Sequence, residues 1–189
     1  MSELFSIQLQ NRQQQGRDGV WLDLPTTTEQ VQAALRQIGI SSDNPQGLFI
    51  SGYFAEEEKR FAIPYNMVLA SNVDELNFLA SRLETLSTGE RAELNAALQA
   101  PQSELFSIGR ITDFPENLDY YVHLPDVHGP AQLGDYYLNR SGMVDMPEEW
   151  KGGIDTAQFG RYVAQQEQGA FTQYGYLVKS GDEWQKVHE

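Results

Sequence analysis

Residues 20–39 carry a strand signal, a stop and a full set of helix signals in immediate succession. The strand reads VWLDL and ends before Pro25, because proline cannot donate a hydrogen bond to a neighbouring strand. Thr26 and Glu29 then have capping-box spacing, apolar residues follow on one helix face, and Gly39 stands where glycine can end a helix in the left-handed conformation. A strand followed directly by an amphipathic helix predicts a fold that combines strands with helices.

The pattern changes twice along the chain, which predicts an elongated α+β protein of three small modules. Residues 1–61 add strand signals at 4–9 and 48–54, and these predict a small sheet with one helix. Residues 62–102 carry two helical apolar stripes, which predict a helical hairpin or bundle. Residues 103–189 mix helix and strand signals, which predict a mixed α/β module.

Start signals mark the helices of the second and third modules. Asn72 can cap the first helix of the hairpin, and Asp155 can cap a helix late in the chain. Pro130 and Pro147 stand at two further helix starts, and the second is followed by two glutamates that suit the positive end of a helix dipole. Residues 171–178 are then predicted to form a strand.

The sign of the charge is the unusual feature of the composition. Twenty-seven Asp and Glu face 13 Lys and Arg, which gives a net charge of -14. Such a field repels nucleic acid and anionic membranes and attracts basic protein surfaces. The chain has no cysteine, which excludes thiol nucleophiles, thiolate metal sites and disulfides and fits a reducing compartment.

The sequence gives no sign of a secretory signal or of a membrane-spanning segment. The first residues lack the basic and apolar regions of a secretory signal, and the most apolar window, residues 61–70, is too short to span a bilayer. We therefore expect a soluble, cytoplasmic protein that binds neither nucleic acid nor membrane directly.

The segment HLPDVH, residues 123–128, is the part of the sequence that looks most like a chemical site. His123, Asp126 and His128 are possible zinc ligands, but a zinc site needs about three or four ligands on a rigid frame. Prolines hold this segment extended or turned, and no third histidine lies nearby. We therefore predict that the protein holds no metal and no cofactor. The alternative to a zinc site is a polar turn whose histidines bond to the backbone or cap the next helix.

Catalytic motifs are absent as well. The chain contains no phosphate-binding glycine loop, no dinucleotide fingerprint, no HExxH and no GxSxG. A pair of hydrolytic carboxylates remains an alternative, because 27 acids form many pairs whose separation a sequence does not give. We predict that the protein is not an enzyme.

The acids are concentrated in a segment that is poor in bases. Residues 111–139 contain neither Lys nor Arg, and residues 108–189 carry 13 acids against six bases, which is half of the net charge. We therefore take the candidate partner-binding acids from this segment: Asp113, Glu116, Asp119, Asp126, Asp135, Asp145, Glu148 and Glu149.

Several stretches, in order along nearly the whole chain, resemble the ArdA family of antirestriction proteins. The first is WLDLP followed by the helix that ends in RQIGI, and the second is VDELN with LA in the middle segment. The third and most specific stretch combines ENLD, Tyr121, PDVH and LGDYY. After it come Pro147 with Glu148, Tyr162 and FTQYGY.

The resemblance implies a three-part α+β protein, encoded on mobile genetic elements, that mimics the charge pattern of bent B-form DNA. It also implies a homodimer that occupies the DNA-binding groove of type I restriction-modification enzymes, at their methyltransferase core, and so protects incoming DNA. The alternative from another class is an acidic adaptor that binds a different basic protein, such as a nucleoid protein.

The charge count is compatible with mimicry of DNA. Duplex DNA carries about one negative charge per 1.7 Å of axis, so a stretch of roughly 40 to 45 Å carries roughly 25. The 27 acids of one chain are of that order, and the net charge is about half of it. One chain can thus imitate a short, partly neutralised segment, and a longer groove needs two copies.

Overall fold

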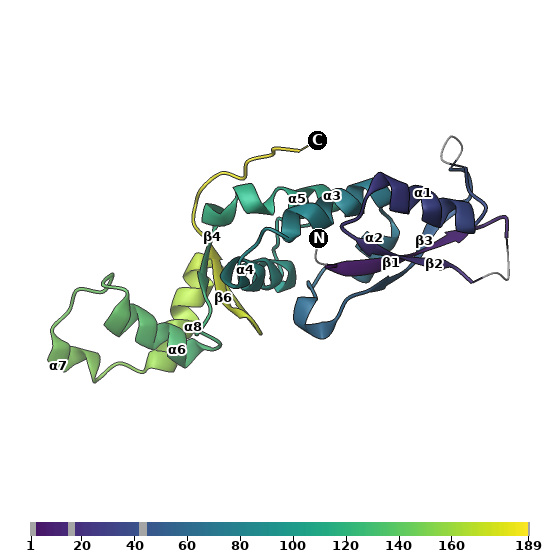
Figure 1. The fold of residues 1–189 in the computed structure, drawn as a ribbon. Coiled ribbons are helices and arrows are strands. Elements are labelled where there is room, and N and C mark those ends of the chain that lie inside the picture. Colours follow the sequence, from purple (N-terminus) through teal and green to yellow (C-terminus); the bar gives the residue numbers. More distant parts are fainter. Residues whose placement is uncertain (1–2, 15–17, 42–44, 189) are drawn as a thin grey trace. The chain divides into compact units, whose positions relative to one another are not determined.

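The computed structural model describes residues 3–14, 18–41 and 45–188, and it combines helices with two three-stranded antiparallel sheets (Figure 1). The predicted α+β class is therefore confirmed. Residue contacts group the chain into two compact units. Unit 1 contains residues 1–87, 105–115 and 186–189, and unit 2 contains residues 88–104 and 116–185. In the described part, no helix is long and apolar enough to cross a membrane.

The sheet of unit 1 has β1 (Phe5–Asn11) at its centre, between β2 (Val20–Leu24) and β3 (Leu48–Phe54). Both pairs are antiparallel, and Ile7 of β1 lies opposite Leu22 of β2 with both side chains buried. Since side chains alternate along a strand, β1 places Phe5, Ile7 and Leu9 on the core face and Ser6, Gln8 and Gln10 on the opposite face.

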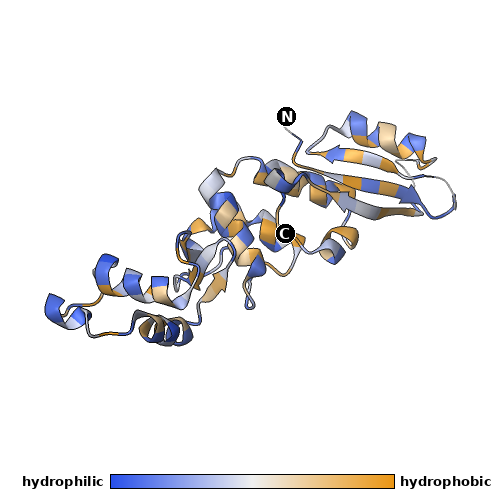
Figure 2. Cartoon of the chain, turned by 90° about the horizontal axis from the view of Figure 1, so that it is seen from below, coloured by the Kyte–Doolittle hydropathy of each residue, from blue (hydrophilic) through white to orange (hydrophobic). Residues whose placement is uncertain are grey.

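The helices of unit 1 supply the rest of its core. They are α1 (Thr28–Gln37), α2 (Tyr65–Leu69), α3 (Val73–Leu83) and α5 (Ile108–Thr112), with the short 3₁₀ turn η1 (Glu57–Lys59). A second 3₁₀ turn, η2 (Phe114–Glu116), begins in unit 1 and ends in unit 2. Helices α1 and α3 contact β2, α2 contacts β3, and α3 packs on α5. Bands of hydrophobic and hydrophilic residues on the helices are visible in Figure 2, as expected for helices that bury one face.

Local helix signals were predicted correctly with one shift. Gly39 has a φ of +69° after α1, and the Asn72 side chain accepts the Glu75 amide at the start of α3. The capping box of α1, however, uses Thr27 and Gln30 rather than Thr26 and Glu29. The sequence offers the same spacing in both registers, and the Thr26 amide donates instead to Asn77 Oδ1 at 2.7 Å.

Unit 2 combines a second sheet with helices. Its sheet has the order β4-β6-β5, and its elements in chain order are α4 (Thr88–Gln99), η3 (Leu118–Tyr120), β4 (Tyr121–Leu124), α6 (Pro130–Asp135), the π-helical turn η4 (Tyr136–Arg140), α7 (Glu148–Lys151), α8 (Thr156–Glu167), β5 (Ala170–Thr172) and β6 (Gly175–Lys179). The predicted helix starts at Pro130, Pro147 and Asp155 are confirmed, the last by a bond from the Gln158 amide to the Asp155 side chain.

The single strand predicted at 171–178 is wrong, because the chain makes a hairpin there. Strands β5 and β6 pair antiparallel around a turn, and Gly175 opens β6 with a φ of +117°. A Cβ at this position would overlap the carbonyl oxygen of Leu124 on β4. Only glycine combines this backbone conformation with so close an approach.

Two glycines join α6 to α8. A Cβ on Gly160 would overlap the carbonyl oxygen of Pro130, and a Cβ on Gly134 would overlap that of Thr156. The backbones of the two helices therefore approach closely beside a core formed by Val127, Leu133 and Tyr176. Contacts place α3 in unit 1 and α4 in unit 2, so residues 62–102 contribute to both units. The division into modules 1–61, 62–102 and 103–189 stays a prediction.

Candidate functional site

The candidate acids fall mainly in unit 2, where they are exposed. Asp113 belongs to unit 1 and the other seven to unit 2. Six of these seven have exposed side chains, namely Glu116, Asp119, Asp126, Asp145, Glu148 and Glu149, and Asp135 is half-buried. Unit 2 holds 14 acids against five bases, a net charge of -9, and unit 1 holds 13 against eight, a net charge of -5.

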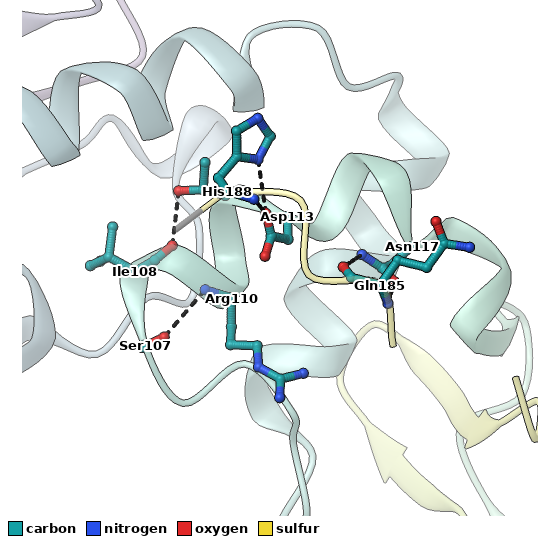
Figure 3. Close-up of polar contacts among 8 residues, drawn as sticks. Ser107, Ile108, Arg110, Asp113, Asn117, Gln185 and His188 are labelled. Atoms are coloured by element: carbon teal, nitrogen blue, oxygen red, sulfur yellow. Dashed lines mark hydrogen bonds and ion pairs between the residues drawn. The ribbon is translucent and has the colours of Figure 1, made fainter. Parts of the chain in front are cut away.

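Asp113 differs from the other candidates because it is buried, with 1% of its surface exposed. Its Oδ1 accepts the backbone N–H of His188 at 2.9 Å and lies 2.8 Å from Nδ1 of the same residue (Figure 3). These contacts hold the carboxylate inside unit 1, where it cannot present its charge to a partner. We therefore leave Asp113 out of the candidate surface.

Asp135 pairs with a guanidinium, that of Arg140. Arg140 donates to Asp135 Oδ2 through Nε at 3.1 Å and through Nη2 at 2.6 Å, and Asn139 donates to Oδ1. The hydrogen bonds from Arg140, and then that from Asn139, lower the pKa of the Asp135 carboxyl. The two partners are five residues apart in sequence, and the π-helical turn η4 lies between them; such turns are frequent at functional sites.

Glu148 and four further exposed acids keep most of their charge available. Glu148 pairs with Lys151 at 2.8 Å, and exposed pairs of this kind are worth little. Within the described residues, no ion pair involves Asp119, Asp126, Asp145 or Glu149. No basic side chain of the described residues therefore offsets the charge of these four exposed acids.

Glu93 of α4 is an acid that the sequence reasoning missed. Its Oε1 is buried and has no hydrogen-bond partner among the described residues. Burial, followed by repulsion from Glu90 and Asp119, raises the pKa of Glu93 to about 7. Acids from α4 and from η3 therefore lie close together in unit 2. The sequence reasoning missed this because it placed α4 in a separate helical module, and no local pattern signals a contact between residues 93 and 119.

The HLPDVH segment serves structure. His123 lies on β4, and its Nε2 is 2.7 Å from the carbonyl oxygen of Tyr174, which confirms a histidine bonded to the backbone. The backbone N–H of His128 donates to Gln132 Oε1 in the first turn of α6. Across the described ranges, no group of three or more His, Cys, Asp or Glu lies close enough together to hold a metal ion.

A groove of about 620 Å³ lies within unit 2, where the end of α4, the end of α8 and the strands β5 and β6 meet. Its charged side chains are bonded internally. Glu167 accepts hydrogen bonds from the hydroxyls of Tyr137 and Tyr176, and Lys179 donates to Glu104 at 2.7 Å. Burial, and then the bond to Glu167, raises the pKa of both tyrosines. The described residues that line the groove therefore offer no pair of unbonded carboxylates.

Comparison with known proteins adds one finding. No curated protein gives a significant match to the chain. A family model described as "Antirestriction protein (ArdA)" matches residues 15–178, a range that takes in most of both units. The chain therefore belongs to the ArdA family of antirestriction proteins.

Proposed function

We propose that this protein blocks type I restriction-modification enzymes by taking the place of DNA in the groove of their methyltransferase core. The observation that carries the proposal is the exposure of Asp119, Asp126, Asp145 and Glu149, unpaired among the described residues, in a unit of net charge -9. A groove that binds DNA presents Lys and Arg to phosphates, and the same side chains can pair with carboxylates. Incoming mobile DNA is then protected because the enzyme's groove is occupied.

The proposed binding is electrostatic and spread over many contacts. Each exposed charge pair is worth roughly 0 to 1 kcal/mol, so the surface acts through number rather than through one residue. The attraction is screened over about 8 to 10 Å at physiological salt, so affinity should fall as salt rises. A homodimer belongs to the same proposal, since two copies double the length of duplex that can be imitated.

Competition with DNA tests the proposal directly. The purified protein is titrated into a type I enzyme with a labelled duplex that carries the recognition sequence, at two salt concentrations. The expected result is displacement of the duplex, with inhibition of cleavage over the same range and weaker displacement at the higher salt. Enzyme that binds the protein and DNA together would overturn the proposal.

A pair of matched variants then locates the surface. The test variant changes Asp119, Asp126, Asp145 and Glu149 to their amides. The control variant changes four exposed acids of unit 1 to amides, namely Asp18, Glu29, Glu57 and Asp74. Both variants lose the same charge. We expect the test variant to inhibit more than about ten-fold less well and the control to change much less.

Equal losses in the two variants would show that net charge alone matters and would contradict the assignment to unit 2. Loss of all activity from one amide substitution would favour the carboxylate hydrolase. Capture of a nucleoid protein, without any effect on the restriction enzyme, would favour the acidic adaptor.

A further inference from the structure

The sheet of unit 1 leaves one face open, and this face carries aromatic rings. Trp21 on β2 is 50% exposed and Phe54 on β3 is 54% exposed. In the register of the sheet, Trp21, Gln8 and Gly52 form one row across the strands, and Asp23, Ser6 and Phe54 form the next. The open face therefore has an aromatic ring at two opposite corners and a carboxylate at a third.

The lack of a side chain at Gly52 leaves room for the indole ring of Trp21. A Cβ on Gly52 would lie 3.0 Å from the Cη2 atom of Trp21, so the ring of Trp21 reaches across β1 as far as β3. The polar groups beneath it are bonded within the sheet, because Ser51 Oγ donates to Gln8 Oε1 at 3.1 Å. The ring thus lies along the sheet, supported from below, and half of its surface is free.

Carboxylates line the same face. Asp23 is exposed beside Trp21 on β2, and the Ser6 hydroxyl donates to Asp23 Oδ1 at 2.8 Å. Exposed Glu3 lies near the same hydroxyl, at 3.4 Å. The two rows of face positions described above contain no Lys or Arg, and Lys59, which lines a small pocket with Glu3 and Phe54, pairs with Glu56 at 3.0 Å.

One stacked guanidinium, that of Arg12, lies near the end of this face. Phe49 lies opposite Gln10 in the register, and Arg12 sits over the Phe49 ring with its Cζ atom 5.2 Å from the centroid. Among the described residues, no cation lies over the ring of Trp21 or Phe54. A guanidinium stacks on an aromatic ring and pairs with a carboxylate at the same time. The face therefore offers the rings and the charges that an arginine from outside requires.

We propose that this open face, defined by Trp21, Asp23, Gly52 and Phe54, is a docking surface for arginine side chains of a basic protein. Its residues belong to unit 1, whereas the acids proposed above belong to unit 2, and it acts by stacking as well as by charge. Single-stranded nucleic acid also stacks on aromatic rings, but the net charge of -14 repels it. The identity of the partner as a restriction enzyme rests on the proposed function. The preference of the face for arginine does not.

Two peptides of equal charge, nona-arginine and nona-lysine, probe the face by calorimetric titration into the full chain. The test variant is Trp21→Leu with Phe54→Leu. The matched control is Trp150→Leu, which removes an exposed tryptophan from unit 2. Loss of each ring should weaken arginine-peptide binding by about two- to five-fold, and lysine-peptide binding should change less. Trp150→Leu should leave both affinities unchanged.

Trp21→Phe keeps a ring and should retain affinity within about two-fold, which separates stacking from damage to the fold. Wild-type affinity in the double variant, or equal losses for both peptides, would overturn the proposal. So would binding of a thymidine oligonucleotide that the double variant loses. The same double variant in the restriction assay should inhibit less well than wild type. If wild-type protein itself fails to inhibit, the proposed function fails while the peptide result still decides the chemistry of this face.

Discussion

Asp113 and His188, 75 residues apart, are joined by two contacts to a single oxygen atom. Asp113 Oδ1 accepts the His188 amide at 2.9 Å and lies 2.8 Å from His188 Nδ1 (Figure 3). Within unit 1, the His188 ring also packs edge-on against Phe78 of α3 at 5.1 Å between centroids. The last described residue is therefore tied to both α5, which Asp113 ends, and α3.

Asp113→Ala should destabilise unit 1 by about 1 to 3 kcal/mol, because the half-buried His188 loses the acceptor of two contacts. Asp145→Ala is the control, since this exposed acid should change the free energy of unfolding by less than about 0.5 kcal/mol. Urea unfolding of both variants measures the difference. Inhibition by Asp113→Ala, measured where it is folded, should equal that of wild type. Weaker inhibition would return Asp113 to the partner-binding surface.

The sequence predicts features that depend on neighbouring residues. The strand at 20–24, the left-handed Gly39 and the caps by Asn72 and Asp155 all follow from patterns a few residues long, and the structure has each of them. In α1 the same local rule holds, and only its register shifts. A distant group, Asn77, takes the Thr26 amide and so leaves Thr27 as the cap.

Features that depend on distant residues were not predicted. The turn inside 171–178 depends on how closely Gly175 passes Leu124, and the burial of Asp113 depends on His188. For the acids of the candidate site, exposure could be predicted for the six in unit 2, because acidic side chains stay in water unless they find a partner; their role in binding stays a prediction. Sequence patterns could not show which acids find one, as Asp113 does.

Gly160→Ala should destabilise unit 2 by more than about 2 kcal/mol. The added methyl group would overlap the carbonyl oxygen of Pro130, and backbone atoms yield less easily than side chains. Gly152→Ala is the matched control, because nothing lies within 4 Å of its Cβ position. The control should be neutral or slightly stabilising. Equal thermal unfolding midpoints for the two variants would show that α6 and α8 do not pack through glycine.

Tyr176→Phe should cost roughly 1.5 to 3 kcal/mol, because the Tyr176 hydroxyl donates to the Glu167 carboxylate at 2.6 Å. Tyr162→Phe, which changes an exposed ring, is the control and should cost almost nothing.

Since burial and Glu167 raise the pKa of Tyr137 and Tyr176, these two rings should ionise after the exposed tyrosines in an alkaline absorbance titration. Ionisation of every tyrosine in one step, while the protein stays folded, would contradict this arrangement.

The last prediction concerns Glu93, whose pKa is raised to about 7 by burial and by its acidic neighbours. The folded state therefore binds this proton more tightly than the unfolded state, in which the carboxyl titrates near 4.5. Protonation of Glu93 therefore contributes fully to the free energy of unfolding below pH 4.5, and this contribution is lost as the pH rises through about 7.

Glu93→Gln removes this dependence. The variant should match wild type at about pH 5 and exceed it at about pH 8 by about 1 to 2 kcal/mol, after allowance for solvent screening of a partly exposed group. Glu149→Gln changes an exposed carboxyl of the same unit and should show no such change between the two pH values. Urea unfolding at both pH values gives the comparison. If the advantage of Glu93→Gln over wild type is the same at both, Glu93 is charged in the folded protein throughout, with a partner that compensates for its burial.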